Sequence, residues 1–370
     1  MTATEIPGEA ENSVNTQNQW RWNSFLTIAV MLHIPFFVYP ILRLCSWLDI
    51  SWWLTILVFI PLASSQIISR VYFRHREEAW AKIYRRCADF WMGLTPVLLI
   101  TLLTFEVIVS ISDLSTRVAG LSVIGLTFAG GFFGLIVAIT PRVKQIVLHS
   151  KKISTPLRFV QITDVHIGSR SKMFLEKVIF RVNRLNPDFL CITGDFIDAS
   201  NVSESDLCSL KSLSCPIYFC LGNHEKYEDL EQIIQRLKNL GVHVLQSDAM
   251  HFRGDVQVLG IDDMEDPLQV EKELPNIQLD ADALKILLYH RPRGLEAARD
   301  AGIDLTLSGH THNGQIFPFN LVVNRVFNRT KGMYQLGDSR QYVSQGTGTW
   351  GPVMRLGTTS EITLFNYLPE

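Results

Sequence analysis

The residues best suited to chemistry in this 370-residue chain are carboxylates, one amide and several imidazoles that follow short apolar runs. They are Asp164, His166, Asp195, Asn223, His224, His290, His310 and His312. Oxygen donors mixed with imidazoles, without thiolates, suit Mn²⁺, Fe or Zn²⁺ better than Cu(I). Leaving His224 aside, the other seven are too many for one first-row ion, so they predict a site for two.

The spacing of these residues indicates how they converge. Asp164 and His166 are two residues apart, as are His310 and His312. In an extended segment residues i and i+2 face the same way, so each pair is expected to reach one locus. Asp195 has two oxygens and can bridge two ions.

Two divalent ions favour the hydrolysis of a phosphate ester. Their four positive charges, reduced by Asp164, Asp195 and a bridging hydroxide, leave a centre that attracts an anionic ester. The hydroxide held between them then attacks in line. His224 follows Asn223 and is placed to stabilise the phosphoryl group or to protonate the leaving alkoxide. Singly, each residue is more often a turn, cap or surface residue; their joint occurrence favours the metal site.

Buried strands must position these side chains. Short apolar runs of this kind are typical of strands covered on both faces, and open α/β sheets bind ligands beyond the carboxyl ends of their strands. The runs lie at 157–163, 189–193, 217–221, 284–289 and 303–307. Helical patterns at 171–186, 203–212 and 228–240 alternate with them, and further strands are expected at 242–246, 256–261 and 361–365.

Five motifs carry a resemblance to a known family. They are Asp164-x-His166, Gly194-Asp195-x-x-Asp198, Gly222-Asn223-His224-Glu225, His290 and Gly309-His310-x-His312. Together they resemble the signature of the calcineurin-like metallophosphoesterases, over about residues 157–365. The segment from Ser308 to Gln315, with Pro318, is most similar to the membrane-associated, bacterial-type branch. Asn313 stands where that branch often has Gly, a departure at the substrate edge.

The resemblance implies a fold and a set of roles. The fold is a four-layer α/β (α+β) metallophosphoesterase sandwich. One ion would be bound by Asp164, His166, Asp195 and His312, and the other by Asp195, Asn223, His290 and His310. His224 would be the catalytic histidine, and Asp198 would support a ligand rather than bind metal.

The N-terminal part is much more apolar than the rest. Hydrophobic residues make up 47% of the chain and charged residues 19%, and the apolar excess lies between residues 24 and 140. Four segments there, each of roughly 18–24 residues, are long enough to cross a hydrocarbon core. They are 24–45, 51–69, 88–111 and 118–140. Buried helices of a soluble protein are the alternative, which four such segments in series disfavour.

Basic residues predict the orientation of these spans. Eleven Lys and Arg lie before the first span, in the loop 70–87 and after the fourth span, against two in the other loops. This bias predicts that both termini and the C-terminal domain are cytoplasmic, in a multi-pass protein of the inner cell membrane. The six cysteines contain no CxxC pair, which agrees with a reducing compartment.

We therefore expect four parts: a disordered tail (1–20), a four-helix transmembrane domain (21–140), a basic linker (141–156) and the metallophosphoesterase domain (157–370). The linker alternates basic and apolar residues, so it is expected to be an interfacial helix or a solvated connection. Within the spans, Gly130 and Gly134 could form a helix-packing face. Glu106 is expected near the membrane interface.

The predicted function is a membrane-anchored, dinuclear phosphoesterase that uses Mn²⁺, with Fe or Zn²⁺ as alternatives. Its substrate would be a phosphodiester, a phosphomonoester or a pyrophosphate, with a lipid-linked ester as one such class; no nucleic-acid partner is expected. A catalytically silent scaffold on a membrane bundle is the alternative, disfavoured because every ligand is present. A transport path is disfavoured because the spans contain few polar residues.

Overall fold

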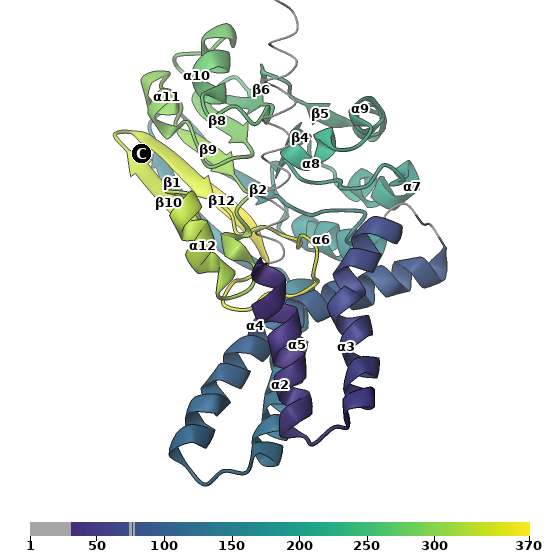
Figure 1. Cartoon of the computed structure of the whole chain (residues 1–370). Coiled ribbons are helices and arrows are strands. Elements are labelled where there is room, and N and C mark those ends of the chain that lie inside the picture. Colours follow the sequence, from purple (N-terminus) through teal and green to yellow (C-terminus); the bar gives the residue numbers. More distant parts are fainter. Residues whose placement is uncertain (1–30, 74–75, 77) are drawn as a thin grey trace, which may run out of the picture. The chain divides into compact units, whose positions relative to one another are not determined.

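The computed structural model describes residues 31–73, 76 and 78–370 (Figure 1). They fall into two compact units, which divide between Gly130 and Gly131. The predicted tail, 1–20, and the start of the first predicted span, 24–30, lie outside the described residues.

The first unit consists of apolar helices. In chain order they are η1 (Ile34–Val38), α2 (Tyr39–Trp47), α3 (Trp52–Ile67), η2 (Ile68–Tyr72), α4 (Ala79–Ile111) and the first part of α5 (Thr116–Ile139). Three stretches have the length and composition to cross a membrane, namely Trp52–Tyr72, Ala79–Ile111 and Thr116–Ile139. The segment Met31–Trp47 is apolar but shorter over its described part, so the structure matches three of the four predicted spans.

The predicted loop 70–87 is largely helical instead. Helix η2 continues to Tyr72, and α4 begins at Ala79 rather than near residue 88. The stretch 79–87 is rich in Ala, Lys and Arg, which are good helix formers, so the charged residues extend the helix. Within this unit Glu106 accepts a hydrogen bond from Arg43 Nε at 2.6 Å, which neutralises its charge.

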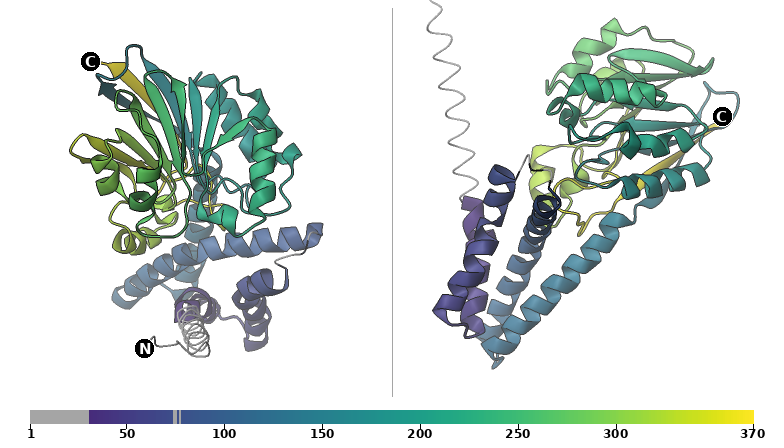
Figure 2. Two further views of the ribbon diagram at one scale, coloured as in Figure 1. Left: turned by 90° about the horizontal axis from the view of Figure 1, so that it is seen from above. Right: turned by 90° about the vertical axis from the view of Figure 1, so that its right-hand side faces the viewer.

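The second unit contains two six-stranded sheets (Figure 1, Figure 2). The first has the order β1-β12-β2-β3-β4-β5. Its strands are β1 (Arg142–Ser150), β2 (Leu157–Ile162), β3 (Phe189–Thr193), β4 (Ile217–Cys220), β5 (Val242–Val244) and β12 (Glu361–Pro369). The second has the order β10-β11-β9-β8-β7-β6. Its strands are β6 (Asp248–Arg253), β7 (Val256–Ile261), β8 (Leu284–Tyr289), β9 (Leu305–Ser308), β10 (Gly332–Leu336) and β11 (Ser339–Val343).

Helices cover the outer faces of both sheets. The first sheet packs against α6 (Lys172–Arg184), α7 (Glu204–Leu207) and α9 (Leu230–Asn239), and the second against α10 (Gln269–Glu273) and α11 (Leu295–Asp300). A third buried cluster joins the inner faces of the two sheets and includes Phe159, Phe189 and Tyr342. This confirms the predicted α/β sandwich, with its layers in the order helix, sheet, sheet, helix.

The segment predicted as a basic linker contains a strand. Residues Arg142–Ser150 form β1, which pairs in parallel with β12 from Arg142 opposite Glu361 to Ser150 opposite Pro369. Ile146 and Leu148 turn inward, whereas Val147 is exposed. The alternation of basic and apolar residues that suggested an interfacial helix is therefore the period of a half-buried edge strand.

The strands that precede the predicted ligands are largely as expected. β2, β3 and β4 are parallel neighbours in one sheet, and β8 and β9 are parallel neighbours in the other. Parallel neighbours end at one edge, so the side chains that follow them collect there. The predicted capping box of Ser203 and Asp206 is present, but its helix 203–212 is divided into α7 and the 3₁₀ turn η3 (Cys208–Ser212).

Candidate metal centre

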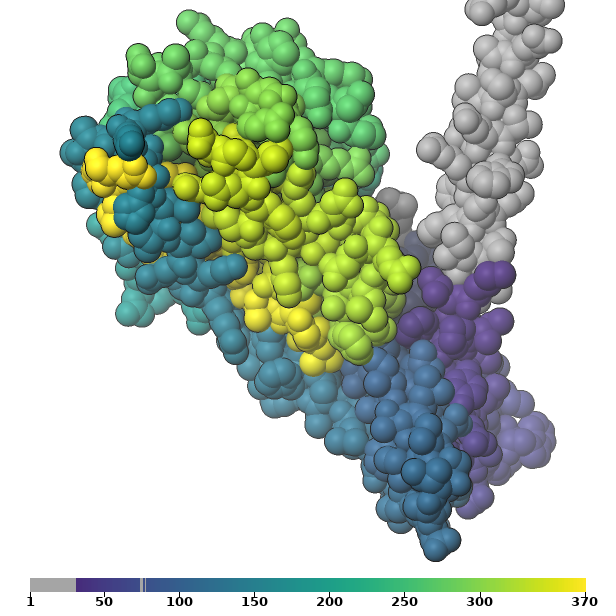
Figure 3. Space-filling model, turned by 90° about the vertical axis from the view of Figure 1, so that its left-hand side faces the viewer, coloured from purple at the N-terminus to yellow at the C-terminus, as the bar shows by residue number. Residues whose placement is uncertain are grey.

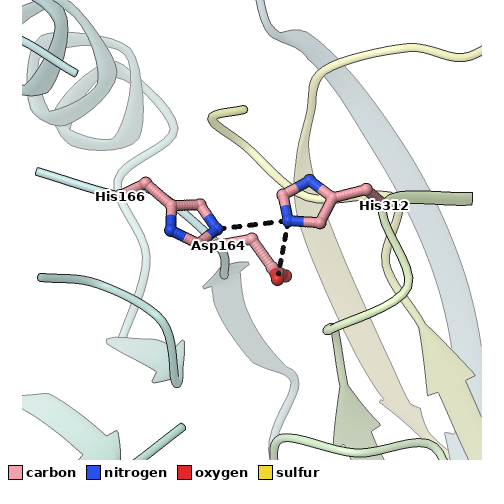
Figure 4. Close-up of side chains that lie close together, drawn as sticks. All are labelled: Asp164, His166 and His312. Atoms are coloured by element: carbon pink, nitrogen blue, oxygen red, sulfur yellow. Dashed lines mark hydrogen bonds and ion pairs between the residues drawn. The ribbon is translucent and has the colours of Figure 1, made fainter. Parts of the chain in front are cut away.

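The polar residues predicted at the strand ends lie in buried clusters at the edge of the sandwich. Asp164, His166 and His312 form one cluster, with His166 Nε2 3.1 Å from His312 Nε2 (Figure 4). Asp164 Oδ1 lies 3.3 Å from His312 Nε2. Asp164 follows β2 and His312 begins the short turn η5 (His312–Gly314) after β9, so both sheets contribute.

A second cluster consists of Asp195, His290 and His310. His290 Nε2 lies 3.1 Å from Asp195 Oδ2 and 3.2 Å from His310 Nδ1. His290 Nδ1 donates to the Thr193 carbonyl at 2.8 Å, which leaves Nε2 directed at the cluster. Protein ligands bind a first-row ion at roughly 2.0–2.2 Å, so neighbours on one ion lie roughly 3.0–3.4 Å apart. The separations in both clusters fit such an ion.

Asn223 supplies the remaining predicted donor. It is the first residue of α8 (Asn223–Lys226), directly after β4 and Gly222. Its side-chain oxygen is buried and has no hydrogen-bond partner among the described residues. A buried acceptor without a partner is unfavourable unless something else binds it, so this oxygen also fits a bound cation.

The charges of the second cluster depend on one another. Burial alone would raise the pKa of Asp195, but His290 and other nearby imidazoles hold that pKa well below its ordinary value. Burial alone would lower the pKa of His290, but the Asp195 carboxylate raises it to about 10. Burial, together with the charge of His290, holds the pKa of His310 well below its ordinary value. Without a metal, the cluster is therefore an ion pair beside a neutral imidazole.

His224 belongs to neither of these two clusters; with His166 and Asp198 it forms a third, less buried group whose ligand atoms all lie within 4.8 Å of one another. Its Nε2 is 4.0 Å from Asp195 Oδ2, and its side chain is 20% exposed, whereas those of His166 and His290 are fully buried. Its ring meets the His166 ring edge-on, with centroids 4.8 Å apart. Burial lowers the pKa of His224. It is thus an imidazole that a substrate can reach.

Asp198 lies behind His166. Its Oδ2 is 3.4 Å from His166 Nδ1 and accepts from Ser169 Oγ at 2.6 Å, and its Oδ1 accepts from the Ser169 N–H at 2.9 Å. Both carboxylate oxygens therefore hold the His166 loop. This geometry agrees with the supporting role expected for Asp198.

The backbone at these residues is not extended, contrary to expectation. Asp164, His166, Asp195, His310 and His312 all have positive φ, between 46° and 71°. The left-handed region is rare for residues with a Cβ and costs of order 1–3 kcal/mol each when imposed by surrounding structure. Asp164 and His166 therefore reach one cluster through a tight turn, not through the alternation of a strand, whereas His310 and His312 belong to different clusters.

The glycines of the motifs make room for the carboxylates. A Cβ at Gly222 would lie 2.3 Å from Asp195 Oδ1, and one at Gly309 would lie 2.2 Å from Asp164 Oδ2. Both distances are far below van der Waals contact. Gly222 and Gly309 are thus required because the carboxylate of a predicted metal ligand packs directly against each of them.

Glu225 is a functional residue that the sequence reasoning assigned no role. It is fully buried, and its two oxygens accept from the backbone N–H groups of Asp195, Phe196, Ile197 and Gly222 at 2.6–3.1 Å. Burial raises its pKa to about 7. It therefore ties the turn after β3 to the turn after β4. A carboxylate three residues after a helix N-cap is the signal that could have identified it.

Arg355 is a second such residue. It is fully buried, and its guanidinium donates to the carbonyls of Gln345 at 2.6 Å, Gly348 at 2.8 Å and His312 at 3.3 Å. Burial lowers its pKa to about 10, so it remains a cation at neutral pH. It fixes the His312 turn against the loop 344–349. Its position in the sequence gives no sign of this role.

Comparison with known proteins agrees with the geometry. The model of the calcineurin-like phosphoesterase family matches residues 157–314. An uncharacterized metallophosphoesterase of Helicobacter pylori is 32% identical over 265 residues, which are 68% of this chain and 69% of that protein. The chain belongs to the calcineurin-like phosphoesterase family. Membership assigns it to the metal-dependent phosphoric ester hydrolases.

Two other relatives show how far the similarity extends. An uncharacterized metallophosphoesterase of Campylobacter jejuni is 33% identical over 237 residues, which are 61% of this chain and 63% of that protein. A Danio rerio protein named transmembrane protein with metallophosphoesterase domain is 29% identical over 360 residues, 84% of this chain and 79% of that protein. Since 84% exceeds the share of the second unit alone, this similarity extends into the apolar helices.

Proposed function

We propose that this chain is a membrane-anchored phosphoesterase that holds two divalent ions at the edge of its sandwich. The observation that carries the proposal is the pair of clusters, in each of which two pairs of neighbouring donor atoms lie 3.1–3.3 Å apart. One ion would be held by Asp164, His166, Asp195 and His312. The other would be held by Asp195, Asn223, His290 and His310.

The ions would polarise the phosphoryl oxygens and lower the pKa of a water to near neutrality. The protein's own groups hold and orient the ligands around them. Asp195 would be the shared ligand; its Oδ2 faces His290, and its Oδ1 accepts from the backbone N–H of His224 at 2.9 Å. Mixed oxygen and imidazole donors favour Mn²⁺, with Fe or Zn²⁺ as alternatives.

His224 would be the proton donor of the reaction in its imidazolium form, which an anionic ester bound beside it would favour. Its side chain is 20% exposed, whereas those of His166 and His290 are fully buried, so it can reach the leaving oxygen of a bound ester. Donation to that oxygen removes the need to expel a charged alkoxide, an effect typically of about 10²–10⁴ in rate. The substrate would be a phosphodiester, a phosphomonoester or a pyrophosphate, with a lipid-linked ester as one candidate class.

The location we propose is the inner cell membrane, with the second unit in the cytoplasm. Three apolar helices of sufficient length support membrane insertion. The excess of Lys and Arg beside the spans supports the orientation. The silent-scaffold alternative gains no support, because all seven predicted ligands are present.

A pair of variants tests the site. We expect His224→Ala to retain metal and to lose about 100-fold or more of kcat on a chromogenic phosphodiester, because only proton donation is removed. Asp195→Ala is expected to lose both metal and turnover, because both ions share its oxygens. Metal content by elemental analysis and steady-state kinetics in detergent check both. Wild-type turnover by His224→Ala would remove His224 from the mechanism, and full metal content in Asp195→Ala would refute the shared ligand.

A further inference from the structure

Helix α12 (Phe319–Val326) exposes the apolar residues that a helix usually buries. Phe, Leu or Val fill five of its eight positions, yet none of its residues is buried. Leu321, Val322 and Val326 are 56%, 59% and 64% exposed. A helix of this length is not stable alone in water, and Val is a poor helix former. The exposed face is therefore suited to a partner.

The domain holds α12 beside the metal centre. Just before the helix, the Phe317 N–H donates to the Leu356 carbonyl at 2.9 Å. Just after it, the Phe327 ring meets the His310 ring edge-on, with centroids 5.4 Å apart. The apolar face of α12 thus lies on the rim of the site that contains His310.

The charged residues of the α12 segment itself are all basic. The sequence contains no Asp or Glu between Asp304 and Asp338, whereas Arg325, Arg329 and Lys331 lie in or directly after the helix. Arg329 pairs with Glu296 at 2.6 Å, while Arg325 and Lys331 are exposed. Apolar side chains next to exposed cations complement a layer of anionic headgroups above hydrocarbon.

The same compact unit includes the last turns of α5. The backbone N–H of Arg355 donates to the Gly134 carbonyl of α5 at 2.9 Å, and its neighbour Leu356 holds Phe317. Figure 3 shows the face that carries the 317–331 region, in yellow-green. Phe132 and Phe133 of α5 are themselves exposed. The same compact unit therefore contains α12 and the C-terminal end of α5, a helix that is apolar enough to cross a membrane.

We propose that the 317–331 segment is a membrane-docking surface whose α12 side chains enter the headgroup region of the bilayer. The partner is an anionic lipid surface, because the chain's own apolar helices bring one to this domain and because the flanking charge is positive. Docking would orient the metal centre so that its α12 side faces the bilayer. This part of the inference rests on the proposed function: the substrate would be an amphiphilic phosphate ester that enters the site from the lipid surface.

A fluorescent probe on α12 tests the docking directly. The full-length chain carries Val322→Cys, with Cys87, Cys208 and Cys215 changed to Ser, and an environment-sensitive dye. It is reconstituted into phosphatidylcholine vesicles with and without phosphatidylglycerol. We expect a blue-shifted emission, quenched about two-fold or more by nitroxides on the acyl chains and more strongly with the anionic lipid. Glu231→Cys, at an exposed position of α9 in the same unit, is the matched control and should not be quenched.

Other outcomes would overturn the proposal. An emission maximum equal to that of the α9 control, with no quenching, would show that α12 stays in water. A blue shift without quenching by acyl-chain nitroxides would show that protein covers the helix, either a second copy of the chain or its own apolar helices. These results do not depend on catalysis, so they separate the docking surface from the proposed activity.

Activity then tests the substrate class. We expect Leu321→Glu with Val322→Glu to lower turnover of a phosphate ester embedded in vesicles by about ten-fold or more while a water-soluble chromogenic ester is cleaved as by wild type. Met250→Glu, on exposed edge strand β6, is the control. Equal turnover of the embedded ester by wild type and the α12 variant would overturn the substrate class. Failure of wild type to cleave either ester would instead count against the proposed function.

Discussion

Left-handed backbone at the predicted ligands is the most informative feature at the scale of residues. Asp164, His166, Asp195, His310 and His312 all adopt it although none is glycine. Such conformations persist only where surrounding contacts impose them, and here buried Glu225 and Arg355 hold the adjoining turns. The backbone strain is therefore located at the residues whose side chains must direct metal-binding atoms into the clusters.

The close glycines give a sharp prediction. In Gly309→Ala the new Cβ would overlap Asp164 Oδ2 and Thr163 Oγ1, both 2.2 Å away. We expect metal affinity to fall about 10–100-fold, as for other losses of ligand support. Titration calorimetry with Mn²⁺ measures it. Gly254→Ala is the matched control, because nothing lies within 4 Å of its added Cβ. Equal affinities in the two variants would show that Gly309 is not needed for close packing.

The candidate metal ligands were predictable from the sequence, but the buried residues that hold their turns in place were not. The metal-ligand candidates stood out because each follows an apolar run, and the structure brings the histidines and carboxylates among them into two clusters. Glu225 and Arg355 did not stand out. Their role is to bind backbone groups of other turns, and a sequence does not show which distant N–H or C=O a buried charge will meet.

At the scale of elements, β1 shows where periodicity was misread. Its residues alternate basic and apolar, which fits an interfacial helix, a linker or an edge strand equally well in isolation. The choice depends on β12, which lies more than 200 residues later in the chain and pairs with it in parallel. Buried strands such as β3 needed no distant partner to be recognised, because burial on both faces leaves a continuous apolar run.

Two neighbouring residues of β1 test its place in the sheet. Leu148 belongs to the buried cluster between the sheets, whereas Val147 is exposed. We expect Leu148→Ala to reduce the free energy of unfolding by about 2 kcal/mol. Val147→Ala should change it by less than about 0.5 kcal/mol. Denaturant titration of the detergent-solubilised protein, followed by tryptophan fluorescence, measures both values. If the segment were a solvated linker, the two substitutions would be equally silent.

At the scale of the whole molecule, the division into an apolar part and a catalytic part was predictable from composition. The positions of the helix ends were not. α4 begins nine residues earlier than the predicted span, since Ala, Lys and Arg favour helix whether or not lipid surrounds them. Hydropathy marks where a helix enters hydrocarbon, not where it starts.

The proposed orientation predicts a labelling pattern. Cys208 is exposed in the second unit, so a membrane-impermeant maleimide should label it only after sealed right-side-out vesicles are permeabilised. A second variant lacks Cys87 and Cys208 and carries Asp113→Cys in the exposed link between α4 and α5. Its new cysteine should be labelled without permeabilisation. The reverse pattern would place the catalytic domain outside and contradict the positive-inside argument.

The position of β12 constrains how the domain forms during synthesis. β12 is the last strand in chain order, yet it lies between β1 and β2 in the first sheet. Until the ribosome has delivered residues 361–369, β1 has no neighbour and β2 presents an open edge. A nascent chain would therefore carry an incomplete sheet beside the membrane after its apolar helices had been made. We expect unwanted pairing of the nascent chain to begin at that open edge of β2.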